Sequence, residues 1–309
     1  MAAAAPVLAE MDCPPFCESS KESNSREEDT NQVLATKNKT CDPSSDFLNS
    51  HDICLKNTMD LCLTPLQSLT CTKGTAHTSF IDLQNFSVSH LPPCYQHKEM
   101  FNLVTALADL VIMVQLPQEE NVYLQGTGKI DEVFINTNEN HKCYCLKCST
   151  SQNPSKEWGM IRILTSANLL KGCKDATKYK CTLFFDEEED KVVNLLGNGI
   201  VKMDVDSDYC TFFCISCDMG LVEKLDAYLD VFNKNWSDAV VKYYPTVKCT
   251  DEKLIVIISH PHGCKKHISL GKWSKLEPHV EYDAAMCPGC SGSYLLLPVF
   301  DVDEDSDDM

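Results

Sequence analysis

The chain has 309 residues and a formal net charge of −18, with 45 acidic against 27 basic side chains. Its length allows one large domain or two ordinary ones with a sizeable core. The charge argues against nonspecific binding to nucleic acid, which needs clustered Lys and Arg side chains to replace counterions along the phosphates. We therefore expect no nucleic-acid partner.

The N-terminal stretch "MAAAAPVLAEMDCPPFC" has no basic leader and no apolar core long enough for a secretory signal. No run of about 18 apolar residues occurs either, so we expect no membrane partner. We predict a cytoplasmic or nuclear protein that is not secreted. The 19 cysteines would form a disulfide framework in a short secreted chain, but here their odd number and the missing signal favour reduced thiols.

Residues 1–95 contain polar runs such as "ESSKESNSREEDTNQ" and "CDPSSDFLNSHD", and their few apolar residues show no sustained period. Such a composition buries too little apolar surface to offset the entropy of ordering the chain. We predict that this N-terminal third is disordered. At the other end, residues 301–309 ("DVDEDSDDM") form an acidic tail whose charges repel one another.

The ordered domain is expected over residues 99–300 and begins with a helix in "EMFNLVTALADLVIMVQL". The apolar side chains of that stretch recur on one helical stripe, namely Phe101, Leu103, Val104, Leu107, Leu110, Val111 and Val114. After Pro117, short apolar or alternating runs follow between turn residues, a pattern typical of a β-barrel or sandwich.

A second helix interrupts these strands at residues 220–244. Its apolar side chains step by three or four and share a face, namely Leu221, Leu225, Leu229, Phe232, Trp236 and Val240. We expect both helices to cover the sheets rather than to bind partners.

The stretch "YDAAMCPGCSGSYLLL", residues 282–297, places Ser291 inside a glycine corner. Glycine lets the backbone turn sharply, so the amides of Gly289 and Ser291 could converge on a point where a carbonyl oxygen gains charge. This is the geometry of an oxyanion hole. The same pattern also occurs in plain turns that begin a strand.

The segment "DAAMCPGCSGS" resembles the nucleophile segment of trypsin-like serine peptidases, particularly those of the HtrA type. Four upstream segments resemble the same family in its order: "GTG", "ILTSAN", "DVDSDYCTFFCI" and "IVIISHPHGCKKHISLGKW". "CYCLKC" and "SHPHGC" are also similar to segments of uncharacterised trypsin-fold proteins. The resemblance implies a mainly β, double-barrel fold, with barrel one at residues 118–218, the helix at 220–244 as a connection, and barrel two at 245–300.

Carried over position by position, the resemblance puts the catalytic serine at Ser291, the aspartate at Asp208 and the histidine at Asn168. An asparagine amide cannot act as a base near neutral pH, and losing that base costs about 10⁶-fold in turnover. The resemblance thus implies a pseudopeptidase that binds protein or peptide partners without efficient hydrolysis. The alternative is a serine endopeptidase in which His260 or His262 serves as a substitute base.

The second barrel is expected to be incomplete. The family continues after its serine strand with at least two further strands, whereas "SYLLLPVF" runs directly into the acidic tail. Much of the substrate cleft would then be missing. Another chain or the N-terminal region could complete the barrel, or the sequence is a truncated product.

The cysteine pairs suggest a metal site. Within "HKCYCLKC", His141, Cys143, Cys145 and Cys148 have spacing that suits tetrahedral zinc, and distant cysteines could complete the site. We expect either no cofactor or one structural zinc. The stretch "CTFFCISC" favours core thiols instead, with Cys210 and Cys214 on one strand face and Cys217 on the other. A third hypothesis for the whole protein is therefore a zinc-stabilised interaction module whose serine corner is only inherited.

Overall fold

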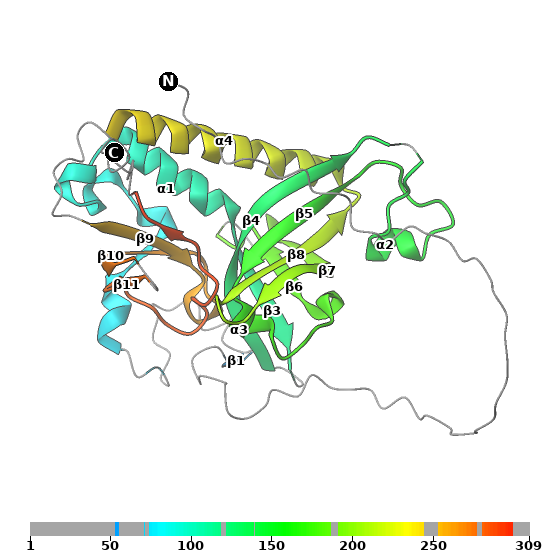
Figure 1. Cartoon of the computed structure of the whole chain (residues 1–309), viewed down its shortest axis with the longest axis horizontal. Coiled ribbons are helices and arrows are strands. Elements are labelled where there is room, and N and C mark those ends of the chain that lie inside the picture. Colours follow the sequence, from blue (N-terminus) through cyan, green and yellow to red (C-terminus); the bar gives the residue numbers. More distant parts are fainter. Residues whose placement is uncertain are drawn as a thin grey trace, which may run out of the picture. The chain divides into compact units, whose positions relative to one another are not determined.

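The computed structural model describes residues 53–55, 71, 74–118, 122–138, 140–186, 191–243, 253–276 and 280–298. The predicted acidic tail and most of the region before residue 71 lie outside the described residues. The described part contains two β-sheets and two long helices (Figure 1).

The first sheet is a closed barrel with one added strand. Its strands are β1 (Ile53–Leu55), β3 (Val111–Pro117), β4 (Val122–Asn136), β5 (Trp158–Thr165), β6 (Lys180–Leu183), β7 (Val193–Asp204) and β8 (Tyr209–Ser216). They are ordered β1-β4-β3-β6-β7-β8-β5, with every neighbouring pair antiparallel. A further antiparallel pairing of β4 with β5 closes the ring from β3 to β8. Closure leaves these six strands without a free edge.

The second sheet is smaller and open. Its strands are β2 (Phe80–Asp82), β9 (Leu254–Ser259), β10 (His267–Lys275), β11 (Glu281–Tyr282) and β12 (Leu295–Leu296). The order is β11-β10-β9-β12, and β2 pairs antiparallel with the first part of β10. The segment before the first helix thus supplies a strand to the sheet, which is one of the completions that the sequence allowed.

Within the described ranges, the fold also contains four α-helices and several short 3₁₀ helices. The α-helices are α1 (Lys98–Leu110), α2 (Leu146–Ser149), α3 (Ala167–Leu170) and α4 (Met219–Tyr243). The 3₁₀ helices are Gly74–Ser79, Leu83–Asn85, Val88–His90, Pro93–Tyr95, Ala176–Lys178 and Pro261–Gly263. In the described part of the chain, no helix has both the length and the apolarity needed to cross a bilayer.

The long helices α1 and α4 lie side by side and cover the sheets (Figure 1). On α4 the predicted apolar face is turned inward: Leu221, Leu225 and Phe232 are buried, while Leu229 and Trp236 pack partly buried against the core. One continuous hydrophobic core joins both helices to both sheets. The mainly β fold, with a barrel, an incomplete second sheet and two covering helices, confirms the predicted fold class.

Two boundaries differ from the prediction. The first helix ends at Leu110, and Val111 and Val114 belong to β3, where six of seven residues are buried. A continuously buried strand has no alternation, so its apolar run continues the helical stripe without a visible break.

The second difference concerns the region predicted to be disordered up to residue 95. Residues 74–95 form four 3₁₀ helices and β2, and the side chains of Phe80, Phe86, Leu91 and Tyr95 are buried. Phe86, Leu91 and Tyr95 reach the main core singly from the short turns, and Phe80 of β2 packs in a smaller cluster with Cys287 and Cys290. Such spacing produces no period of two or 3.6, which is why the sequence pattern missed them.

Candidate functional site

Ser291 lies between two successive tight turns. The Cys290 amide donates to the Cys287 carbonyl at 3.0 Å, and the Ser293 amide donates to the Cys290 carbonyl at 3.1 Å. The glycines on either side have left-handed backbones, with φ of +90° at Gly289 and +84° at Gly292. A side chain at these positions would be strained, so the corner depends on glycine.

The barrel holds this corner through the "GTG" segment of β4. The Thr127 amide donates to the Ser291 carbonyl at 2.7 Å. The Thr127 hydroxyl donates to the Gly289 carbonyl at 2.8 Å and accepts from the His260 amide at 3.0 Å. A single buried threonine therefore joins the serine corner to the turn that follows β9.

Asp208 and Asn168 come together, but through the backbone of Asn168. Asp208 stands in the β7–β8 turn, and its Oδ1 accepts a hydrogen bond from the Asn168 amide at 2.8 Å. The side-chain oxygen of Asn168 instead accepts from Lys171 Nζ at 2.9 Å. Among the described residues, no hydrogen bond joins the Asn168 side chain to Ser291. The residues predicted for the acid and the base are thus neighbours, without a relay to the serine hydroxyl.

Ser166 is a further member of this group that the sequence patterns did not single out. The Ser166 hydroxyl donates to Asp208 Oδ1 at 2.6 Å. Ser166 Oγ also caps the first turn of α3, because it accepts a hydrogen bond from the Leu169 amide. The available signal was a serine immediately before a short apolar helix, which is a common helix cap. Ser166 and the Asn168 amide together fix the position of the Asp208 carboxylate.

The two histidines considered as substitute bases have other partners. His260 is fully buried, and its Nδ1 lies 2.8 Å from the Cys264 carbonyl, which can only accept, so Nδ1 carries the proton. Burial, together with the nearby Lys266 charge, lowers the pKa of His260 to about 3. His262 Nε2 lies 3.1 Å from His77 Nε2, and burial lowers the pKa of His262 to about 4.

The amides proposed for the oxyanion hole have no hydrogen-bond acceptor among the described residues. Within the described ranges, neither the Gly289 amide nor the Ser291 amide donates a hydrogen bond to another residue. The Ser291 hydroxyl likewise has no hydrogen-bond partner among those residues. Free amide donors beside a partly exposed hydroxyl can accept a carbonyl or carboxylate oxygen from a ligand.

The cysteine loop between β4 and β5 converges with the end of β8. The sulfur atoms of Cys143, Cys145, Cys148 and Cys217 all lie within 4.8 Å of one another. His141, predicted as a ligand, does not belong to this group, and Cys217 is the fourth member instead. The backbone carbonyl of His141 accepts a hydrogen bond from Trp158 Nε1, and its exposed side chain stays outside the cluster.

The other cysteines of β8 are core residues. Cys210 and Cys214 are fully buried inside the barrel, and Cys214 Sγ lies 3.8 Å from Cys181 Sγ. They occupy one face of the strand, while Cys217 follows the strand end on the other side, as alternation requires. Only Cys217 of this run can therefore contribute to the cluster.

A second group of four possible metal ligands was not predicted. It consists of Cys71, His77, His262 and Cys287, whose ligand atoms again lie within 4.8 Å of one another. The sequence patterns drew attention to the "SHPHGC" turn and to the serine segment that contains Cys287, but as parts of other sites. Cys71 and His77 fall in the region for which no structure was expected.

No protein-family model matches this sequence, and a search of curated proteins finds no significant relative. Among solved structures, the chain is similar to Deg5, with 14% identity and a TM-score of 0.35, over 65% of this chain and 80% of that chain. It is similar to the active form of the Rv3671c protease from M. tuberculosis, with 12% identity and a TM-score of 0.32, over 63% and 68% of the two chains. It is also similar to the HtrA-type protease AlgW with a tripeptide, with 15% identity and a TM-score of 0.36, over 65% of this chain and 52% of that chain. Likenesses this weak do not decide an activity.

Proposed function

We propose that this protein is a catalytically degenerate trypsin-like module that binds a polypeptide at its serine corner without hydrolysing it efficiently. The proposal is carried by the position expected to hold the base. Asn168 lies beside the Asp208 carboxylate, yet its side chain is an amide that pairs with Lys171. An amide can neither take the proton of the Ser291 hydroxyl nor return it to a leaving group.

The histidines of the turn after β9 offer poor replacements. A general base must reach the hydroxyl directly or through one water, and its pKa should lie near the working pH. His260 is sealed in the core with a pKa lowered to about 3 by burial. His262 faces His77 rather than the serine. Both observations argue against the alternative of an endopeptidase with a substitute base.

The serine corner retains features suited to binding. The amides of Gly289 and Ser291 donate to no described residue and are therefore available to a carbonyl oxygen of an extended polypeptide. The hydrogen bonds of Thr127 keep the corner rigidly seated, so little ordering is needed when a ligand arrives. These features support binding without proton transfer.

The cysteine cluster favours a second candidate function, a zinc-stabilised interaction module. Four thiolates at zinc–sulfur distances of about 2.3 Å would have sulfurs about 3.8 Å apart, by tetrahedral geometry. Cys145 Sγ and Cys217 Sγ are 3.8 Å apart. The loop that these ligands would close presents Tyr144 and Leu146 to solvent, with exposures of 49% and 68%, and such side chains are suited to contacting a partner.

A fluorophosphonate probe distinguishes hydrolase from pseudopeptidase, because the probe reacts with serines activated by a base. Full-length wild-type protein should remain unlabelled, as should the Ser291→Ala variant. Robust labelling of the wild type that disappears in Ser291→Ala would establish an activated serine and contradict the proposal.

The second candidate is tested by binding. Fluorescently labelled carboxymethylated α-lactalbumin, an unfolded polypeptide, should bind equally well to wild type and to a Tyr144→Ala/Leu146→Ala variant if the serine corner is the binding site. Binding that is lost in the loop variant would instead favour the interaction module.

A further inference from the structure

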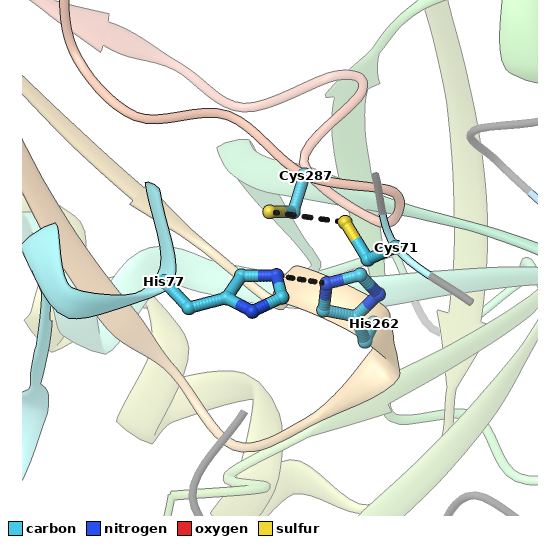
Figure 2. A group of neighbouring side chains, drawn as sticks. All are labelled: Cys71, His77, His262 and Cys287. Atoms are coloured by element: carbon cyan, nitrogen blue, oxygen red, sulfur yellow. Dashed lines mark hydrogen bonds between the residues drawn. The ribbon is translucent and has the colours of Figure 1, made fainter. Parts of the chain in front are cut away.

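We propose that Cys71, His77, His262 and Cys287 bind a zinc ion, which fastens the segment before β2 to the loop that carries Ser291. Figure 2 shows the four side chains turned toward one another. They come from three parts of the chain: the segment before β2, the Pro261–Gly263 helix and the serine loop. Two thiols and two imidazoles form a common tetrahedral zinc donor set.

The spacing of the ligand atoms fits one ion at their centre. With zinc–sulfur bonds of about 2.3 Å and zinc–nitrogen bonds of about 2.0 Å, a regular tetrahedron places the sulfurs about 3.8 Å apart and the nitrogens about 3.3 Å apart. Cys71 Sγ and Cys287 Sγ are 4.0 Å apart, and His77 Nε2 and His262 Nε2 are 3.1 Å apart (Figure 2). Both separations agree within a few tenths of an ångström.

A disulfide does not fit the same atoms, and a hydrogen bond between the two histidines accounts for only half of the group. A disulfide requires its sulfurs about 2.0 Å apart, half of the 4.0 Å between Cys71 Sγ and Cys287 Sγ. Two facing imidazole nitrogens can share only one proton when both rings are neutral. A shared metal ion uses the lone pair of each nitrogen and also accounts for the two thiols beside them.

The backbone that presents His262 is itself unusual. His262 has a φ of 55°, a left-handed conformation that is uncommon for a residue other than glycine. The conformation is held by the His262 amide, which donates to the Pro288 carbonyl of the serine loop at 2.5 Å, and by the Gly263 amide, which donates to the His260 carbonyl. Strained residues of this kind gather at functional sites and ligand clamps. Here the left-handed backbone of His262 turns its imidazole toward the Cys287 thiol.

A supporting layer surrounds Cys287. Its amide donates to Cys290 Sγ at 3.4 Å, and Cys290 Sγ lies 3.2 Å from the Ser259 hydroxyl. Cys290 is fully buried and outside the ligand group, so it orients the loop rather than completing the site. Phe80 of β2 belongs to the same buried cluster as Cys287 and Cys290, and Cys71 packs against that cluster.

The ion would stabilise the second sheet at β2, where few backbone pairings hold the strand. Strand β2 contributes only three residues to the sheet, and three residue pairs join it to β10. A zinc ion just before β2 would anchor that short strand and would brace the serine loop four residues ahead of Ser291. Loss of the ion should therefore loosen both segments together.

Zinc content of the purified full-length chain tests the site. We expect two ions per chain, one in this group and one in the cluster around Cys145. The Cys71→Ser/His77→Ala variant should retain one ion, as should Cys145→Ser. Cys94→Ser should retain two; it is a matched control because Cys94 is another partly buried cysteine of the region before α1, in the Pro93–Tyr95 helix.

A substitution that replaces one zinc ligand with another distinguishes loss of the site from a general loss of folding. Cys71→His preserves a zinc ligand, so it should hold the second ion that Cys71→Ser loses. In cobalt-substituted protein, Cys71→Ser should also remove the charge-transfer absorption of both thiolates of this site, Cys71 and Cys287, while the signal of the four-cysteine cluster remains.

Hydrogen exchange provides the structural readout. A zinc chelator should speed exchange of the β2 amides and of residues 287–293 in the wild type, and it should have no such effect in Cys71→Ser/His77→Ala. The proposal is overturned if the wild type binds no zinc, or if Cys71→Ser/His77→Ala binds as many ions as the wild type. If Cys145→Ser loses zinc and Cys71→Ser/His77→Ala does not, the site proposed here is overturned, while the assignment of zinc to the four-cysteine cluster stands.

Discussion

Replacing Gly292 with alanine measures how tightly the serine corner is seated on the barrel. A Cβ at this position would lie 2.3 Å from the Thr127 carbonyl oxygen, 2.3 Å from Thr165 Oγ1 and 2.8 Å from the Ser166 amide nitrogen. Two of these three atoms belong to the backbone and cannot rotate away. The left-handed φ costs a residue with a Cβ about 1–2 kcal/mol, and overpacking costs about 1–3 kcal/mol more.

We therefore expect Gly292→Ala to lower the free energy of unfolding by about 2–5 kcal/mol. In a domain of this size each kcal/mol shifts the melting temperature by roughly 2–4 °C, so a drop of at least about 4 °C should appear in scanning calorimetry. Gly172→Ala is the control, because no atom lies within 4 Å of its added Cβ. Equal stability of the two variants would refute the close seating of the corner.

Four further substitutions and one metal removal extend these expectations. Ser166→Ala should cost about 1 kcal/mol in urea unfolding because it removes the cap of α3, whereas Ser166→Thr should keep most of that stability. Lys266→Met should cost about 3 kcal/mol because it breaks a buried ion pair; Lys266 Nζ lies 2.8 Å from both the Ala108 carbonyl and Asp186 Oδ1. Lys265→Met, at the more exposed neighbouring position, should change urea unfolding by less than about 0.5 kcal/mol. Chelation of zinc should speed hydrogen exchange at the Cys143 amide, which donates to the Ser155 carbonyl, and unchanged exchange there would count against an ion in that cluster.

The periodic segments of the sequence predicted short strands and two helices, whereas the double-barrel arrangement was implied only by the resemblance to trypsin-like peptidases. The apolar face of α4 repeats over 25 residues, and the turn residues that separate the strands are frequent. Periodicity failed where an element has no alternation, as in β3, whose buried run continued the stripe of α1. It also failed for β2 and the turns around it, because each contributes only one or two buried side chains.

The candidate site was predictable only in part, for a similar physical reason. Ser291, Asp208 and Asn168 could be placed because each lies in a segment that resembles a known motif. Metal groups depend instead on convergence in three dimensions. Cys217 is 69 residues beyond Cys148, and Cys71 is 216 residues before Cys287, so no local spacing reveals that they meet. His141 was predicted as a ligand because it is close in sequence to the three cysteines of the loop. That closeness did not bring its side chain into the cluster.

The missing base is tested most directly by restoring it. Fluorophosphonate labelling should be compared in the wild type, in Asn168→His and in Asn168→His/Ser291→Ala. The Asp208 carboxylate already accepts a hydrogen bond from the amide of residue 168, so a histidine there would have an orienting acid beside it. We predict no labelling of the wild type, clear labelling of Asn168→His, and none once Ser291 is also replaced. Labelling of the wild type at the level of Asn168→His would contradict the account.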